Sequence, residues 1–333
     1  MTSGGQLVLM FTAHDPESGQ DALMVSRSDD DGRAWSEAKV VYGSSQGRPQ
    51  AIDTLTRVRP GRLLAPLLDG SNLRMLASDD DGRTWQVSNI DVKGLEDATP
   101  YGPLVELQGQ LLMPVFGILG GGDQQAPCSG IYRSRDGGKT WGDFTVIDCD
   151  RKEGSINFGP TAVHAGTDGQ LLALITADEF IYRSLSTDGG KTWSRPDQRL
   201  LARHAALASV GSVLACVNQT KAGGMIRIQF SENMFDSWRC DRMLDQGLKG
   251  EYCSAVALDD DRVLLVHDRG SFPPGQRGTR AATGIEIAMM QRNPACPQVP
   301  RIIPPEKRDR LVRCRAMILL YWDGPFRRVA AGE

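Results

Sequence analysis

The chain has 333 residues, including 37 glycines and 18 prolines, which is enough length for one large domain and suits an all-β fold rich in turns. Its 38 basic and 41 acidic side chains are interspersed and leave a net charge of −3, so we expect no nucleic-acid partner. No apolar run approaches the roughly 20 residues of a membrane-spanning helix, so we expect no membrane partner. The first residues do not resemble a signal peptide, which favours a cytoplasmic location by default.

One short pattern, Ser-x-Asp-x-Gly-x-(Thr/Ala)-Trp, recurs along the chain. Four copies occupy residues 28–35, 78–85, 134–141 and 186–193, and a degraded fifth copy, with Asn for Asp, occupies residues 231–238. The copies start at intervals of roughly 50 residues, a period typical of blades in a β-propeller. The repeat therefore predicts a ring of similar sheets.

Each copy of the pattern is predicted to be a β-hairpin turn. It follows an apolar run, such as residues 23–25 or 130–132, and then offers Asp and Gly for turn positions with unusual φ. The Asp carboxylate can accept hydrogen bonds from the backbone of its own loop, and the Trp can pack between neighbouring sheets. The pattern is expected to be structural.

Strands predicted between the copies define six blades in chain order. Blade one begins directly with the run 6–11, whereas each later blade shows an innermost strand before its second strand. The sixth unit carries no copy of the pattern. The predicted strands of blades two to six lie at 50–52 and 62–67; 103–107 and 110–115; 161–163 and 171–175; 205–208 and 213–217; and 254–258, 263–266 and 285–288.

Blade one lacks an innermost strand of its own in this interpretation. The apolar run 316–322 near the C-terminus is the candidate donor, because closing the ring through a terminal strand would remove an exposed sheet edge. The Pro-rich stretch 293–305 would then be the crossing linker. The alternative is a tail that packs outside the ring. We therefore divide the chain into a propeller, 1–292, and a linker with the C-terminal segment, 293–333.

The repeated pattern resembles the Asp-box, or BNR repeat, of sialidases, and we call each copy an Asp-box below. The resemblance implies an all-β, six-bladed β-propeller (sialidase-like) of four-stranded antiparallel blades, with the Asp-boxes on the outer rim away from the active site. It also implies a Tyr nucleophile paired with a Glu, an Asp acid/base and three Arg that bind the sugar carboxylate.

Candidate site residues lie in the segments that lead into the innermost strands, because these segments line the mouth of a propeller. Glu251-Tyr252-Cys253-Ser254 is similar to the start of the last sialidase blade, which makes Tyr252 the candidate nucleophile, with Glu251 or Glu153 as its partner. The family's acid/base Asp precedes the first Asp-box, where Asp15 and Asp21 stand. The candidate substrate-binding residues are Arg48, Asp97, Tyr101, Asn157, Arg203 and Arg269.

The resemblance is incomplete at the arginine clamp. The first clamp arginine belongs to the innermost strand of blade one, which this sequence does not show. Where the second arginine is expected, the chain has Thr176-Ala177-Asp178-Glu179. Structural alternatives also stand beside the candidates: packing for Tyr252, a solvated turn for Asp15 and Asp21, and interblade ion pairs for Arg48, Arg203 and Arg269.

The predicted function is that of a sialidase-like exo-glycosidase that removes a terminal sugar from a glycan. The alternatives are a non-catalytic carbohydrate- or protein-binding propeller and a polysaccharide lyase on the same scaffold. The seven cysteines form no C-x-x-C pair and no cysteine has His at metal-ligand spacing, so we expect reduced, mostly buried thiols, with no metal and no cofactor.

Overall fold

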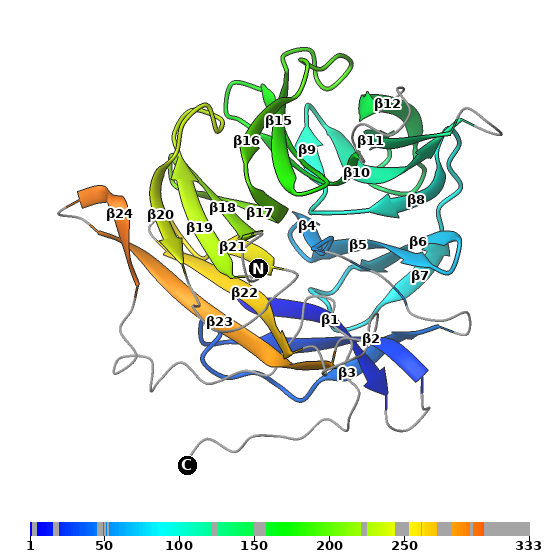
Figure 1. Cartoon of the computed structure of the whole chain (residues 1–333). Helices are drawn as coiled ribbons and strands as arrows, with labels where there is room; N and C mark the ends of the chain where they lie inside the picture. Colours follow the sequence, from blue (N-terminus) through cyan, green and yellow to red (C-terminus); the bar gives the residue numbers. More distant parts are fainter. Residues whose placement is uncertain are drawn as a thin grey trace.

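A computed structural model gives the fold. It describes residues 1, 5–15, 20–44, 49, 51, 53–120, 125–149, 158–220, 225–243, 253–260, 262–271, 281–293 and 296–302. For residues 13–15, 20, 239–243 and from 268 onward only the backbone is described. These residues form six antiparallel sheets that follow one another around a ring in chain order (Figure 1). The predicted all-β propeller is confirmed.

Blades one to three contain twelve strands. Blade one is the three-stranded sheet β1-β2-β3, blade two is β4-β5-β6-β7, and blade three pairs β12-β11-β10-β8 with β9 also on β10. Their bounds are β1 Leu7–Asp15, β2 Gln20–Ser28, β3 Lys39–Gly43, β4 Thr56–Arg59, β5 Arg62–Asp69, β6 Asn72–Ser78, β7 Gln86–Asn89, β8 Glu96–Pro100, β9 Val105–Leu107, β10 Gln110–Leu119, β11 Ala126–Ser134 and β12 Gly142–Cys149.

Blades four to six are four-stranded sheets in simple up-and-down order. Their bounds are β13 Phe158–Ala165, β14 Leu171–Ala177, β15 Phe180–Ser186, β16 Asp197–Leu200, β17 Ala202–Val210, β18 Val213–Thr220, β19 Ile226–Ser231, β20 Arg239–Met243, β21 Cys253–Ala257, β22 Arg262–Ser271, β23 Ala281–Asn293 and β24 Cys296–Ile302. The sixth sheet thus extends to Ile302, into the stretch that the sequence predicts as a linker. Among the described residues there is no helix long and apolar enough to cross a membrane.

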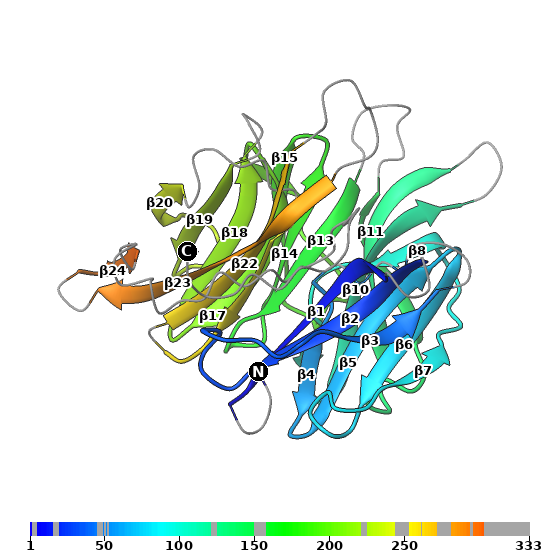
Figure 2. The ribbon, with the colours of Figure 1, turned by 90° about the horizontal axis from the view of Figure 1, so that it is seen from below.

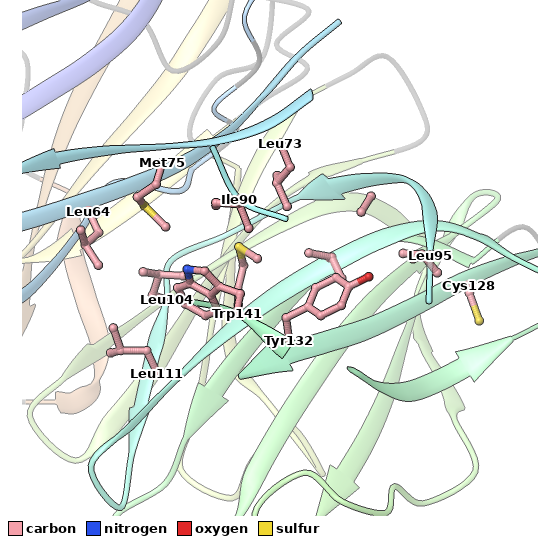
Figure 3. Packing of buried hydrophobic residues seen from close by; sticks show 13 residues of the cluster. Leu64, Leu73, Met75, Ile90, Leu95, Leu104, Leu111, Cys128, Tyr132 and Trp141 are labelled. Carbon is pink, nitrogen blue, oxygen red and sulfur yellow. The ribbon is translucent and has the colours of Figure 1, made fainter. Parts of the chain in front are cut away.

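The core lies between the blades rather than within them. Figure 3 shows the apolar cluster between blades two and three, where Leu64 and Met75 of one sheet face Tyr132 and Trp141 of the other. All four side chains are buried. Strands inside a blade are apolar on both faces because each face of the sheet packs against a neighbouring blade. This explains the nearly continuous apolar run of β14.

The Asp-boxes form the tight turns that the sequence predicts. In the third box the Ser134 hydroxyl donates to Asp136 at 2.8 Å and accepts from the Gly138 N–H at 2.8 Å, and Trp141 Nε1 donates to the Gly138 carbonyl at 3.2 Å. The Thr140 hydroxyl and backbone N–H hold the pKa of Asp136 well below its usual range. Gly138 has φ +88°, and a Cβ there would lie 2.6 Å from a Leu64 methyl group, so a larger residue would strain the backbone and displace Leu64.

The degraded fifth box keeps the same hydrogen bonds with an amide in place of the carboxylate. Ser231 donates to Asn233 Oδ1 at 3.0 Å, and the N–H of Ser237 donates to the same oxygen at 3.0 Å. Phe235 occupies the glycine position with φ 60° and is fully buried. The fifth turn therefore keeps its hydrogen bonds because Asn233 supplies the accepting oxygen in place of Asp. The Phe235 side chain, in place of Gly, packs into the core.

Arginines link blades to the box turn of the next blade. Arg27 donates to the Asp81 carbonyl at 2.5 Å, Arg133 to the Gly190 carbonyl at 2.6 Å and Arg199 to the Asp236 carbonyl at 3.0 Å. Between blades six and one, Arg262 forms an ion pair with Asp31 at 2.8 Å. We call these four contacts the arginine links.

We expect Arg133→Met to lower the free energy of unfolding by about 2–3 kcal/mol, because the buried carbonyl of Gly190 and the partly buried carbonyl of Asp143 lose their donor. Arg133 is only 8% exposed, so water cannot replace it without rearrangement. Equilibrium urea unfolding measures the change. Lys139→Met, an exposed control in the neighbouring turn, should change stability by less than about 0.5 kcal/mol. Equal effects of the two substitutions would contradict the assigned role.

The cysteines depart in part from the sequence-based expectation. Cys128 and Cys149 form a disulfide between β11 and β12, where they are directly opposed in the strand register with their Cα atoms 4.3 Å apart. Residue counting could not find this pair, because the two cysteines lie 21 positions apart and meet only through the pairing of these strands. Cys216 and Cys253 carry buried, reduced thiols, as expected.

The two ends of the ring differ. The β4–β5 turn lies beside the second Asp-box, since the N–H of Asp81 donates to the Gly61 carbonyl at 2.9 Å. Innermost strands therefore end at the face that carries the boxes, the box end, and begin at the opposite face, which we call the pocket end. Figure 2 shows the ring from the side of blade one, with β1, β2 and β3 among the nearest strands.

Candidate functional site

A cavity of about 240 Å³ lies at the centre of the ring. Its walls come from three neighbouring blades: Leu7, Val8, Leu9 and Met10 of β1, residues 53–57 before and within β4, and Ser254, Ala255 and Val256 of β21. Met1 also contributes to the wall, in agreement with the position of the N-terminus near the ring axis in Figure 1. Trp35 and Leu264 line the cavity towards the box end, Asp53 and Ser254 line it towards the pocket end, and Arg57 of β4 is a further ionisable residue of its wall.

Asp53 is the ionisable group towards the pocket end. Its side chain is partly exposed to the cavity, yet it lies deep within the ring, where burial raises the pKa of the carboxyl group to about 7. A hydrogen bond from the Ser254 side chain opposes part of that shift. Asp53 also has φ 55°, a backbone conformation that costs free energy and is common at functional positions.

The segment around Asp53 is held by hydrogen bonds to blades two and three. The Thr54 hydroxyl donates to the Pro66 carbonyl at 2.7 Å, and the Thr56 hydroxyl donates to the Thr54 carbonyl at 3.0 Å. The N–H of Leu104 in turn donates to Thr56 Oγ1 at 2.8 Å. A carboxyl group on a segment fixed in this way is pre-organised for one position in the cavity.

Tyr101 and His204 meet near the axis on the opposite side of the ring. Their ring centroids are 6.4 Å apart, and the Tyr101 side chain is 1% exposed. The His204 N–H donates to Thr176 Oγ1 at 3.1 Å, and its carbonyl accepts from Cys253 Sγ at 3.2 Å. His204 therefore ties blades four, five and six together where their innermost strands begin.

Arg203 and Asp97 lie at the pocket end with different surroundings. Arg203 forms an ion pair with Glu179 at 3.8 Å, and both side chains are substantially exposed. Glu179 belongs to the β14–β15 turn, at the place where the resemblance leads one to expect an arginine. Asp97 is exposed on β8 and has φ 49°. Both residues are open to solvent rather than to the cavity described above.

The remaining described candidates lie on strands of blades one and six. Asp21 of β2 is opposite His14 of β1, and Asp15 is opposite Gln20 at the tip of the same hairpin. Arg269 of β22 is opposite Gly284 of β23. The β1–β2 hairpin reaches the pocket end, so it brings Asp15 and Asp21 to the same face as Asp53.

The other five candidates, Tyr252, Glu251, Glu153, Asn157 and Arg48, lie outside the described residues. Tyr252 and Asn157 directly precede β21 and β13, two innermost strands that begin at the pocket end. Their proposed roles remain predictions. No cluster of three or more His, Cys, Asp or Glu side chains suited to a metal ion occurs in the part of the chain that the structure describes.

Asp53 is the site residue that sequence reasoning missed. The sequence predicts the innermost strand of blade two at 50–52 and its lead-in segment before it, so Asp53, which follows that run, is not among the predicted candidates. The structure begins β4 only at Thr56 and leaves residues 53–55 as the segment that leads into it. The sequence does contain a signal for this residue: Asp53 is an acidic residue directly after an apolar run and directly before Thr54-Leu55-Thr56.

The ring of antiparallel sheets, its Asp-box turns and its axial cavity define a propeller of the Asp-box class. The sequence model of the BNR repeat-like domain matches residues 67–265, more than half of the chain. The chain belongs to the BNR repeat-like domain family. Among curated protein sequences none matches it significantly.

Solved structures share the fold. A protein of unknown function from Dyadobacter fermentans is 18% identical, with a TM-score of 0.71 over 87% of this chain and 93% of its own. The Hadza microbial sialidase Hz136 is 20% identical, with a TM-score of 0.66 over 81% of this chain and 62% of the sialidase. The intramolecular trans-sialidase from Ruminococcus gnavus, solved with oseltamivir carboxylate, is 12% identical, with a TM-score of 0.59 over 86% and 91%. At these identities the similarity establishes the fold.

Proposed function

We propose that the protein is a glycoside hydrolase, a sialidase-like exo-glycosidase that removes a terminal sugar, acidic or neutral, from a glycan. The observation that carries the proposal is Asp53, a carboxyl group with a pKa of about 7 at the pocket end of a central cavity. Such a group is protonated below neutral pH, as a general acid for glycosidic-bond cleavage must be. The sialidases among the structural neighbours lend support.

In the proposed reaction Asp53 donates its proton to the glycosidic oxygen as the bond from that oxygen to the anomeric carbon breaks. The Tyr252 oxygen attacks the anomeric carbon from the other face, and Glu251 or Glu153 takes the phenolic proton. Water then displaces Tyr252 from the anomeric carbon, the Asp53 carboxylate accepts a proton from that water, and the Glu returns its proton to the departing Tyr252 oxygen. Arg48 and Arg269 are proposed to bind the sugar, and Asp15 or Asp21 is the alternative acid.

A substrate screen with the full chain tests this function. We expect release of the aryl group from at least one aryl glycoside of sialic acid, a neutral sugar or a uronic acid, and we expect Tyr252→Phe to abolish it. Sugar binding without turnover of any glycoside would identify a binding propeller and overturn the proposal. Release of an unsaturated product absorbing in the near ultraviolet would identify a lyase and would also overturn it.

A further inference from the structure

A proline interrupts the pairing of β4 with β5 next to Asp53. β5 is a central strand, which pairs with β4 on one side and with β6 on the other. Thr56 of β4 is opposite Leu64 of β5. Continuing that register puts Thr54 opposite Pro66, and a proline has no backbone N–H with which to complete a hydrogen-bonded pair. The strand β4 accordingly begins only at Thr56.

Two threonine hydroxyls take the place of the missing pair. The Pro66 carbonyl accepts a hydrogen bond from Thr54 Oγ1 at 2.7 Å, so this carbonyl points towards the segment that leads into β4. The Thr54 carbonyl, which meets no N–H on Pro66, accepts from Thr56 Oγ1 at 3.0 Å. Both carbonyls are thus satisfied although the backbone pairing has ended. The chain before Thr54 no longer has to follow β5.

Blade three contains a similar arrangement. Pro66 lies four positions after the start of β5, and Pro114 lies four positions after the start of β10. The chain opposite Pro114 is divided into β8 and β9, which pair with different parts of β10. Between them, the Tyr101 N–H donates to the Pro114 carbonyl at 3.1 Å. In both blades the proline therefore stands where the innermost chain leaves its partner strand near the axis.

Blades four and five show the contrast. The positions that correspond to Pro66 hold Ile175 and Val217. Each of these residues pairs with the innermost strand of its blade, and the pairing continues beyond it, across a shift in register, as far as Phe158 and Ala202. The early end of β4 thus accompanies Pro66 and is not a general property of the blades in this ring.

We propose that Pro66 and Thr54 are positioning residues for Asp53: the proline ends the innermost strand of blade two, and the Thr54 hydroxyl fixes the released chain so that Asp53 faces the cavity. Asp53 directly precedes Thr54 and has φ 55°, a conformation that a strand does not allow. Its side chain lines the cavity together with Ser254 of β21. The catalytic part of this role rests on the proposed function, whereas the placement of Asp53 can be measured without a substrate.

The thermal stability of the full-length protein tests the placement. Asp53→Asn removes a buried charge and should raise the thermal midpoint at pH 8, because burial holds the pKa of this carboxyl group at about 7. In a Thr54→Val background the segment is less fixed and the carboxyl group less buried, so the same substitution should give less than about half of that gain. An undiminished gain, or no gain in the wild-type background, would overturn the proposal.

Thr161→Val is the matched control. Thr161 lies in the innermost strand of blade four, is fully buried and donates its hydroxyl to the Gly159 carbonyl at 2.9 Å. Its substitution should lower the thermal midpoint and leave the gain from Asp53→Asn intact. Thr54→Ser keeps the hydroxyl and should restore the wild-type gain. A gain that Thr161→Val reduces equally would reflect general loosening of the ring and would also overturn the assignment.

Kinetics test the catalytic part on a glycoside that the wild-type protein hydrolyses. Thr54→Val should lower kcat about tenfold with little change in KM, because the acid is misplaced rather than removed. The alkaline decline of activity should move to lower pH, since a less buried carboxyl group loses its proton earlier. An unchanged kcat and pH profile would overturn the catalytic part. Absence of turnover by the wild-type protein would contradict the proposed function, while the thermal measurements would still decide the placement of Asp53.

Discussion

Asp53→Asn is expected to lower kcat by about 100-fold or more on a glycoside with a poor leaving group, because an amide cannot donate the proton that the departing oxygen needs. With an activated aryl leaving group the loss should be much smaller, since that group leaves without protonation. Wild-type activity should fall as pH rises through about 7, where the raised pKa of Asp53 predicts loss of the acid form. The variant should lack this alkaline decline.

The same substitution has an opposite effect on stability, which separates catalysis from folding. The folded protein holds the proton of Asp53 up to about pH 7 and the unfolded chain releases it near pH 4, so ionisation destabilises the folded state as pH rises between these values. Asp53→Asn should therefore raise the thermal midpoint at pH 8 and leave it nearly unchanged at pH 4. Differential scanning calorimetry measures both.

Asp168→Asn is the matched control. Asp168 is exposed in the β13–β14 turn at the box end, where its carboxylate accepts from the Gln170 N–H at 3.0 Å. It should not change the ratio of rates on the two leaving groups. If Asp53→Asn reduces both rates equally and leaves the alkaline decline in place, Asp53 is not the acid, and Asp15 or Asp21 becomes the first choice.

Trp141→Ala is expected to lower the free energy of unfolding by about 3–5 kcal/mol, the usual cost of truncating a large buried aromatic side chain. Trp141 is 7% exposed and packs between blades two and three, where Leu64 and Met75 lie on the facing sheet (Figure 3). Its Nε1 also donates to the Gly138 carbonyl, so the substitution loosens the box turn as well. Equilibrium urea unfolding gives the value.

Trp35→Ala is the control for position in the ring. Trp35 makes the same hydrogen bond to its own box, at 3.0 Å from the Gly32 carbonyl, but it is only partly buried and packs against a small cluster with Leu7 and Leu264. Trp35→Ala should lower the free energy of unfolding clearly less than Trp141→Ala does. A cost as large would mean that the box turn, rather than packing between blades, dominates the contribution of these tryptophans.

The parts of the fold that the sequence predicted correctly are those that depend on local chemistry. An Asp-box is a local turn, in which the side chains of Ser134 and Asp136 make hydrogen bonds within their own loop, so its residues can be identified without knowledge of the neighbouring blades. The apolar second strands, such as β14, could likewise be predicted from their runs of apolar residues. The number of blades followed from the apolar strands predicted between and after the boxes, because the sixth unit carries no box.

The candidate site was less predictable because it depends on contacts between distant segments. The raised pKa of Asp53 arises from burial among segments of blades one, two and six, and it is opposed in part by Ser254, a neighbour some two hundred positions away, so no local pattern encodes it. The pairing of Cys128 with Cys149 likewise depends on the register of β11 and β12. Arg203 was recognised as a cation at the pocket end, but its ion pair with Glu179 appears only in the folded ring.

The arginine links imply that the ring unfolds blade by blade, because each blade is stabilised by contacts with its two neighbours. Each link joins one blade to the next, so its loss weakens a single boundary, while the other boundaries keep their contacts. Blades two and three are joined by the large apolar interface around Trp141, whereas the described residues join blades six and one through the Arg262 ion pair and a small cluster around Leu7 and Leu264. Thermal unfolding should therefore start between blades six and one and spread around the circle.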